Sequence, residues 1–130
     1  MIVLMYTCHV RSILEYAAPV FNSFLTQGDS NILEKVQEKF LRVIFGYKKT
    51  YLELCEEADL ESLEKRRMLL CINFVKKEMK KSDSIFKWAD KSNTRIGVKD
   101  RLVIPMARSQ IHFNTPMIAL ARMYNQSIAN

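Results

Sequence analysis

The chain has 130 residues, of which 48% are hydrophobic and 26% are charged, and these values are typical of a single globular domain rather than a disordered chain. With only three glycines and three prolines the composition favours helices, and no run of about 18 apolar residues predicts a membrane span. The net charge of +6 lies in residues 76–130, which carry eleven basic and four acidic residues. This excess favours a polyanionic partner, or else it serves solubility alone.

Residues 2–17 predict a first helix. Pro19 is expected to end it, because the residue before a proline avoids the helical region. The apolar positions recur at spacings of three and four, which is the pattern of a buried helical stripe. That predicted stripe consists of Val3, Tyr6, Val10, Ile13, Leu14 and Ala17.

A second helix is expected to begin near residues 29–31, where Asn31 and Glu34 have the spacing of a capping box. Gly46 is well placed to end it, because glycine accepts the left-handed conformation that often follows a helix. The pattern places Gln37 on a polar face, away from the predicted stripe. That stripe consists of Leu33, Val36, Phe40, Val43 and Ile44.

Thr50 and Glu53 form a further capping box and predict a short helix over residues 50–58. Residues 59–80 predict the longest helix, with a wide apolar surface that is typical of a central helix. Arg66 and Arg67 lie beside that surface. Either their stems pack while their heads reach water or a glutamate, or they contact phosphates. The apolar positions are Leu63, Leu69, Leu70, Ile72, Phe74 and Val75.

The last third predicts less regular structure before a final helix. Residues 82–90 fit one helical turn, residues 91–100 a polar loop, and residues 101–113 a short irregular or β-ribbon segment. Thr115 followed by Pro116 is good helix-start chemistry and predicts a terminal helix that ends near Asn125. The expected fold is therefore mainly α, with a helical region over residues 1–81 and a basic segment over 82–130, packed as one domain.

Neither a metal centre nor a catalytic centre is expected. The three cysteines, Cys8, Cys55 and Cys71, have no C-x-x-C pairing, which predicts buried reduced thiols in an intracellular protein. His9 and His112 do not lie at metal-ligand spacing, and no nucleophile elbow, phosphate-binding glycine loop or H-E-x-x-H motif is present. The acidic cluster is better explained by helix starts and a solvated surface than by a divalent cation. It consists of Glu53, Glu56, Glu57, Asp59, Glu61 and Glu64.

Four segments together carry a resemblance to a known family. They are "VRSILEYAAPVF" at 10–21, "ILEKVQEKFLRVIFG" at 32–46, "YLELCEEADLESLEKRR" at 51–67 and "TRIGVKDRLVIPMARSQIHFNTPMIALARMYN" at 94–125. They resemble, in the same order, the region downstream of the catalytic palm in reverse transcriptases of non-LTR retrotransposons, the LINE and jockey-like elements. The chain departs from that pattern at Phe21, where tryptophan is usual, and it holds no pair of adjacent aspartates like that of the palm.

The resemblance implies that residue 1 lies in the middle of a larger ancestral open reading frame and that the chain is a thumb-like region. Its implied role is to grip the phosphates and sugars of an RNA–DNA template–primer duplex, in the nucleus, without reading bases. The Mg²⁺ ions of nucleotide transfer would belong to the missing palm, so the chain would be inactive alone and need no cofactor of its own. The residues expected to contact nucleic acid are Gln37, Lys39, Arg42, Arg66, Arg67, Arg95, Arg101 and Arg108.

Two other functions remain open. The chain could be a helical interaction module that uses an apolar face of the first helix to dimerise or to bind a protein such as a polymerase palm. It could instead be a stand-alone basic nucleic-acid-binding protein whose contact surface lies between residues 76 and 108. The first helix discriminates between these functions, because full burial of its apolar residues would indicate a self-sufficient domain.

Overall fold

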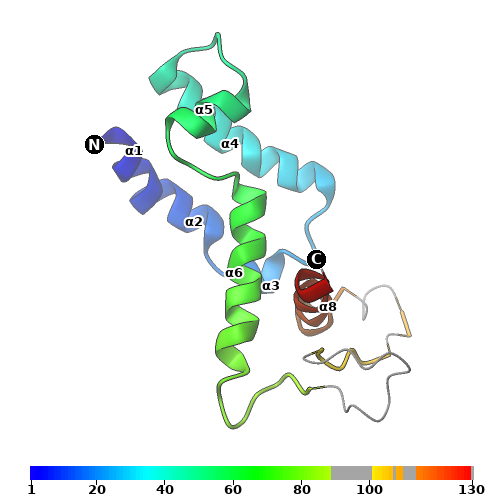
Figure 1. The fold of residues 1–130 in the computed structure, drawn as a ribbon. Helices are drawn as coiled ribbons and strands as arrows, with labels where there is room; N and C mark the ends of the chain where they lie inside the picture. The colour runs from blue at the N-terminus through cyan, green and yellow to red at the C-terminus, as the bar shows by residue number, and fades with distance from the viewer. Residues whose placement is uncertain (89–100, 107, 110–113, 130) are drawn as a thin grey trace. The chain divides into compact units, whose positions relative to one another are not determined.

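A computed structural model describes residues 1–88, 101–106, 108–109 and 114–129, and within them the fold is mainly helical with no sheet, as predicted (Figure 1). Two compact units are present. Unit 1 comprises Met1–Ala18 with Leu25–Arg67, and unit 2 comprises Pro19–Phe24 with Met68–Asn130. The chain therefore passes between the units after Ala18, Phe24 and Arg67, whereas the sequence predicts one boundary, after residue 81. The helical elements are α1 (Ile2–Met5), η1 (Tyr6–Arg11), α2 (Ser12–Glu15), α3 (Ala18–Phe21), α4 (Gln27–Phe45), α5 (Tyr51–Glu57), α6 (Leu63–Glu78) and α8 (Pro116–Ala129).

The first predicted helix forms, but its buried face is not the one that regular periodicity predicts. The segment η1 is a π-helix, in which each turn holds an extra residue. Tyr6 is buried as expected, but after it the inward-facing positions move along by one residue. Ile13, expected in the stripe, is therefore 74% exposed. Beyond Glu15 the chain turns through Ala17, which has a positive φ of 55°, and Pro19 lies in the first turn of α3, where proline is well tolerated.

The second helix, α4, begins earlier than predicted. Its N-cap is Thr26, whose hydroxyl accepts a hydrogen bond from the Asp29 N–H at 3.2 Å, while the Asp29 carboxylate accepts one from the Thr26 N–H at 3.1 Å. Asn31 lies inside the helix, so the predicted capping box of Asn31 and Glu34 is wrong. Both residues fit the capping pattern locally, but a complete box was available one turn earlier. The hydrogen bonds from Thr26, chiefly from its hydroxyl, lower the pKa of Asp29 below its ordinary value.

Replacing Thr26 with alanine should therefore destabilise the protein by about 1 kcal/mol, because the Asp29 N–H loses its acceptor. The matched substitution Asn31→Ala should change the free energy of unfolding by less than about 0.5 kcal/mol, since Asn31 caps nothing. Urea denaturation of the two variants measures both values. If Asn31→Ala were the more destabilising of the two, α4 would begin near Asn31, as the sequence predicts.

Three other helix boundaries follow from local chemistry. Gly46 ends α4 with a positive φ of 94°, and Thr50 with Glu53 forms the predicted capping box of α5. Asp59 has a positive φ of 53° and ends α5 in a Schellman motif, in which the Leu60 N–H bonds the Cys55 carbonyl at 2.9 Å. Residues 59–62 are therefore not helical, and α6 begins at residue 63. As a result α4, with 19 residues, is longer than α6, with 16.

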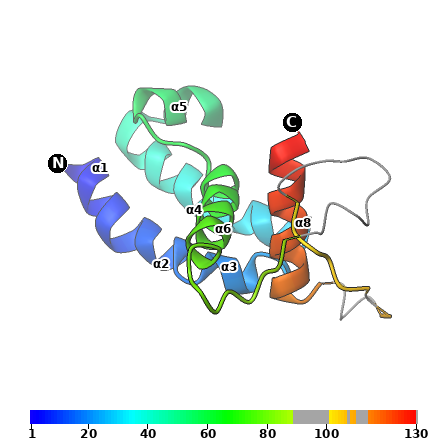
Figure 2. The same ribbon diagram turned by 60° about the horizontal axis from the view of Figure 1, so that its bottom comes forward.

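Each unit has its own hydrophobic core. In unit 1, α5 lies beside α4 in both views, and Leu41, Leu54 and Cys55 are buried between neighbouring half-buried side chains (Figure 1, Figure 2). In unit 2, α8 begins at Pro116 as predicted but continues beyond Asn125 to residue 129. The core of unit 2 consists of Cys71, Val75, Phe86, Leu102, Leu120, Ala121 and Tyr124.

The segment before α8 is irregular where the structure describes it. The Asn125 side chain accepts a hydrogen bond from the Leu102 N–H at 2.8 Å and donates one to the Leu102 carbonyl at 3.0 Å. Leu102 also forms an isolated antiparallel bridge with Trp88. Residues 101–106 are therefore irregular, which is one of the two predicted alternatives. The Asn125 amide makes the two hydrogen bonds to the Leu102 backbone that a neighbouring strand would otherwise make. Figure 2 shows this segment beside α8.

Candidate nucleic-acid interface

Two of the residues expected to contact nucleic acid lie inside unit 1. Gln37 and Arg67 both have 0% exposed surface. The Arg67 guanidinium donates a hydrogen bond from Nη2 to the Ser30 hydroxyl at 2.7 Å. Because neither side chain reaches the surface, we leave both out of any phosphate-contacting set. For Arg67 the structure supports the packing alternative, and its charged head is buried together with its stem.

Gln37 is the centre of a buried hydrogen-bond network instead of part of a polar face. Its Oε1 accepts from the Tyr6 hydroxyl at 3.2 Å, and its Nε2 donates to the Tyr51 hydroxyl and the Glu61 carbonyl, each at 3.0 Å. The Tyr51 hydroxyl in turn donates to the Glu34 carboxylate. A sequence signal for this burial exists, because position 37 lies four residues from both Leu33 and Leu41. The polarity of the amide nevertheless favours an exposed position, so the sequence pattern predicts the wrong face for Gln37.

Burial of this network raises the pKa of Tyr6 to about 12, and burial together with the hydrogen bond to Glu34 raises the pKa of Tyr51. A tyrosine in an unfolded chain ionises near pH 10. The stabilisation from Tyr6 is therefore complete below about pH 10 and is lost as the pH rises through its folded pKa of about 12.

We accordingly expect the free energy of unfolding to fall between pH 10 and pH 12 as tyrosines ionise in the unfolded chain. A Tyr6→Phe variant should lose less stability over the same window, because it has no hydroxyl to ionise at that position. Chemical denaturation at a series of alkaline pH values measures the difference. An equal loss in the variant and the parent would show that Tyr6 ionises freely in the folded protein.

Two further residues of the predicted set are held in ion pairs within unit 1. Arg42 pairs with Glu38, one helical turn away. Arg66 pairs with Glu15 at 2.8 Å and donates two hydrogen bonds to its carboxylate, and this hydrogen bonding to Glu15 is the chief reason that the pKa of Arg66 is raised. A carboxylate thus balances each of these guanidinium groups before any phosphate approaches.

The remaining predicted residues differ in position. Lys39 is exposed on α4, and no ion pair joins it to another described residue. Arg101 and Arg108 are exposed in unit 2. Arg95 lies outside the described residues. The structure therefore keeps Lys39, Arg101 and Arg108 as accessible cations, and it does not bring Lys39 into the same unit as the other two.

The accessible positive charge is concentrated in unit 2. Unit 1 holds nine basic and ten acidic residues, whereas unit 2 holds eleven basic and four acidic residues. Among the described basic residues of unit 2, Lys81 pairs with Glu78. Six others are exposed and form no ion pair with a described residue. They are Lys76, Lys77, Lys80, Lys87, Arg101 and Arg108, which we call the unit 2 cations.

A second surface feature lies on the first helix. Six of its large apolar side chains are exposed, with values that reach 80% at Tyr16. The charged residues of this segment, Arg11 and Glu15, pair with each other and lie on the half-buried side. We call this surface the first-helix face, and it consists of Ile2, Leu4, Met5, Val10, Ile13 and Tyr16. The full burial that would mark a self-sufficient first helix is therefore not observed.

The structure gives local roles to much of the acidic cluster. Glu53 caps α5, Glu57 pairs with Lys49 at 2.7 Å, and Glu61 pairs with Lys65 at 3.0 Å. No group of metal-ligating side chains occurs among the described residues. The three cysteines form no disulfide, with Cys55 and Cys71 buried as expected, but Cys8 is exposed because it lies away from the buried side of the first helix.

Comparisons with protein-family models, with curated proteins and with solved structures found no match to this chain. In the described ranges, every helix is too short or too polar to cross a lipid bilayer.

Proposed function

We propose that this chain is a fragment of an RNA-directed DNA polymerase of a non-LTR retrotransposon, without the catalytic palm. Its inherited role would be to grip the RNA–DNA template–primer duplex in the nucleus. The proposal is supported by the four ordered sequence segments and by a mainly helical fold of the kind expected for a thumb. The chain itself would supply positioning and no nucleotide chemistry.

The observation that carries this proposal is the separation of charge between the units. Of the unit 1 cations in the predicted contact set, Arg42 and Arg66 are already paired with carboxylates and Arg67 is buried, which leaves Lys39. The unit 2 cations are exposed, so they can replace the counterions around a phosphate backbone without first breaking an ion pair. We therefore assign the phosphate contacts chiefly to unit 2, with Lys39 as a separate contact from unit 1. Phosphate contacts of this kind fix position and carry no base specificity.

The test is binding of the purified chain to a labelled RNA–DNA hybrid over a salt series. The association constant should fall linearly with salt on logarithmic axes, with a slope of about −0.9 for each phosphate neutralised. Hybrids of two unrelated sequences should bind equally well, because the contacts are to the backbone. Absence of binding at low salt by a folded chain would overturn the proposal. Equal binding to hybrid and double-stranded DNA would favour a general basic nucleic-acid-binding protein.

The first-helix face supports a second candidate function, that of an interaction module. Its exposed apolar side chains are of the kind that marks protein contact sites. A second copy of the chain, a polymerase palm or another protein could cover it. Sedimentation of the parent and an Ile13→Glu variant separates these cases. Association that depends on concentration and is lost in the variant would indicate a dimer, whereas a monomer in both would leave a different protein as the partner.

A further inference from the structure

An apolar pocket of 220 Å³ lies in unit 2, where the segment after α6 and residues 101–106 meet α8. It is smaller than the pockets that bury a drug-sized ligand, which begin at about 300 Å³, so its volume suits one large side chain. Among the described residues that line it, Lys87 is the only charged one. The six others are Ile85, Phe86, Val103, Pro105, Met117 and Ala121.

The rim of this pocket exposes large apolar side chains to water. Ile85, Val103 and Met117 belong to the lining and are nevertheless exposed. Met106, the residue after Pro105, is 90% exposed. A cluster of exposed apolar side chains around a pocket marks a contact site for another molecule, and methionine adapts well to the shape of a partner.

Positive charge lies beside this apolar surface. The Val103 N–H donates a hydrogen bond to the Lys87 carbonyl at 2.8 Å, which places a lysine next to an apolar residue in the lining. Arg101, two residues before Val103, is exposed as well. Neither cation forms an ion pair with a described residue. The surface therefore suits a partner that carries an apolar side chain with carboxylates near it.

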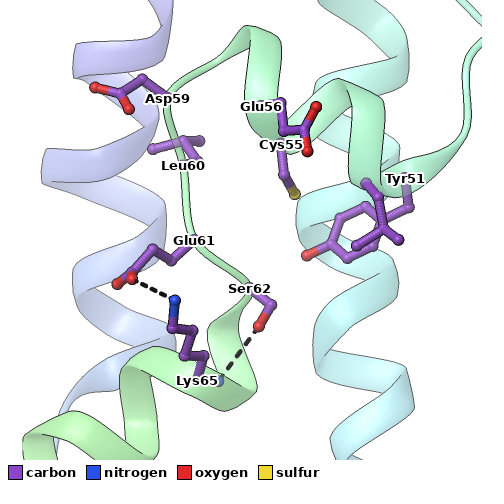
Figure 3. Close-up of a pocket in the computed structure, with 9 residues that line it drawn as sticks. Tyr51, Cys55, Glu56, Asp59, Leu60, Glu61, Ser62 and Lys65 are labelled. Atoms are coloured by element: carbon purple, nitrogen blue, oxygen red, sulfur yellow. Dashed lines mark hydrogen bonds and ion pairs between the residues drawn. The ribbon is translucent and has the colours of Figure 1, made fainter.

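The α5 segment of unit 1 has this combination of side chains. Leu52 is 72% exposed, and Glu56 lies four residues after it, on the same side of α5. The Glu56 carboxylate is exposed and forms no hydrogen bond or ion pair with a described residue, whereas Glu61 nearby pairs with Lys65 (Figure 3). Residues 50–62 hold five acidic residues and no basic one.

We propose that α5 of one copy of the chain docks on the unit 2 pocket of a second copy. Leu52 would enter the pocket and bury its side chain against the apolar lining. Glu56 would lie beside Lys87 at the rim, where an exposed ion pair orients the contact more than it stabilises it. The contact is small, so the association would be weak and transient.

Charge and chemistry favour a second copy as the occupant. Acidic residues outnumber basic ones in unit 1, whereas unit 2 is strongly basic, so the two surfaces attract each other. Nucleic acid suits the pocket itself less well, because its described lining offers no hydrogen-bonding side chain to a base except Lys87. This inference does not depend on the proposed nucleic-acid binding.

The test reverses one charge at a time in the whole chain and follows association by sedimentation equilibrium, at low salt and from micromolar to millimolar concentration. Lys87→Glu alters the pocket and leaves α5 intact, whereas Glu56→Lys does the reverse. Both positions are exposed, so both variants should fold, which circular dichroism verifies. The controls are Lys39→Glu and Glu64→Lys, which make the same two changes in net charge at other exposed positions.

We expect the parent to associate as its concentration rises. Lys87→Glu and Glu56→Lys should each associate at least about tenfold more weakly, because each places like charges opposite each other. The two variants change the net charge in opposite directions, so net charge alone cannot weaken both. An equimolar mixture of them should associate again, because the intact α5 of the first variant meets the intact pocket of the second. The controls should change the affinity less than about twofold.

The apolar part of the contact has its own test. Leu52→Ser should weaken association at least about tenfold, because the pocket loses the side chain that fills it. Ile32→Ser, at an exposed position on α4, should change it less than about twofold. Three outcomes would overturn the proposal: a parent that stays monomeric at millimolar concentration, a mixture that associates no better than either variant alone, or equal losses in the two serine variants.

Discussion

Replacing Gln37 with alanine should lower the free energy of unfolding by about 3 kcal/mol, although the residue is polar and lies in a helix with several exposed positions. The amide is fully buried and joins Tyr6, Tyr51 and the backbone of Glu61. Without it, the Tyr6 hydroxyl loses its partner inside the protein, and an unsatisfied buried group costs about 1–3 kcal/mol. The cavity left by the side chain adds to that cost.

Two further variants separate the causes. Gln37→Met keeps most of the side-chain volume and removes the hydrogen bonds, so it should retain a loss of about 2 kcal/mol. Lys39→Ala, on the exposed side of the same helix, should change stability by less than about 0.5 kcal/mol. Urea denaturation followed by circular dichroism measures all three. If Gln37→Ala were as stable as Lys39→Ala, Gln37 would not connect α4 to the first helix and α5.

A triple substitution of Lys76, Lys77 and Lys80 by glutamine should make binding to the RNA–DNA hybrid less dependent on salt. The slope of the logarithm of the association constant against the logarithm of the salt concentration should become less negative by about two to three. The substitution should also weaken binding at least about tenfold at moderate salt. Each of these lysines is exposed and forms no ion pair with a described residue, so each is available to neutralise a phosphate. The effect should be the same for hybrids of different sequence.

The matched control removes three cations that are held in ion pairs, by substituting Arg11, Arg42 and Arg66 with glutamine; Arg11 and Arg66 share Glu15, and Arg42 pairs with Glu38. The net charge changes by the same amount, but the salt slope should change by less than about one unit. Equal slopes in the two triple variants would mean that binding follows net charge alone. The phosphate contacts could then not be assigned to unit 2.

Much of the helical framework could be predicted because its signals are local. The capping box of Thr50 and Glu53, the end of α4 at Gly46 and the start of α8 at Pro116 each depend on residues within about four positions. The start of α4 at Thr26 also has a local signal, the capping box of Thr26 and Asp29. The similar spacing of Asn31 and Glu34 nearby led to the wrong prediction. The concentration of positive charge after residue 75 was likewise visible in the sequence, and it coincides with unit 2.

Tertiary structure decided which of the predicted side chains are exposed and unpaired, and so able to contact a partner. The sequence determined a helical class, several helix ends and an uneven charge, because these depend on neighbours along the chain. Whether Gln37 is solvated depends on Tyr6, 31 residues away, and whether Arg66 is free depends on Glu15, 51 residues away. The π-helical turns of η1 moved the buried positions of the first helix along by one residue and left Val10 and Ile13 exposed. Burial and ion pairing arise only when distant segments meet, so polarity and periodicity alone placed these residues on the wrong faces.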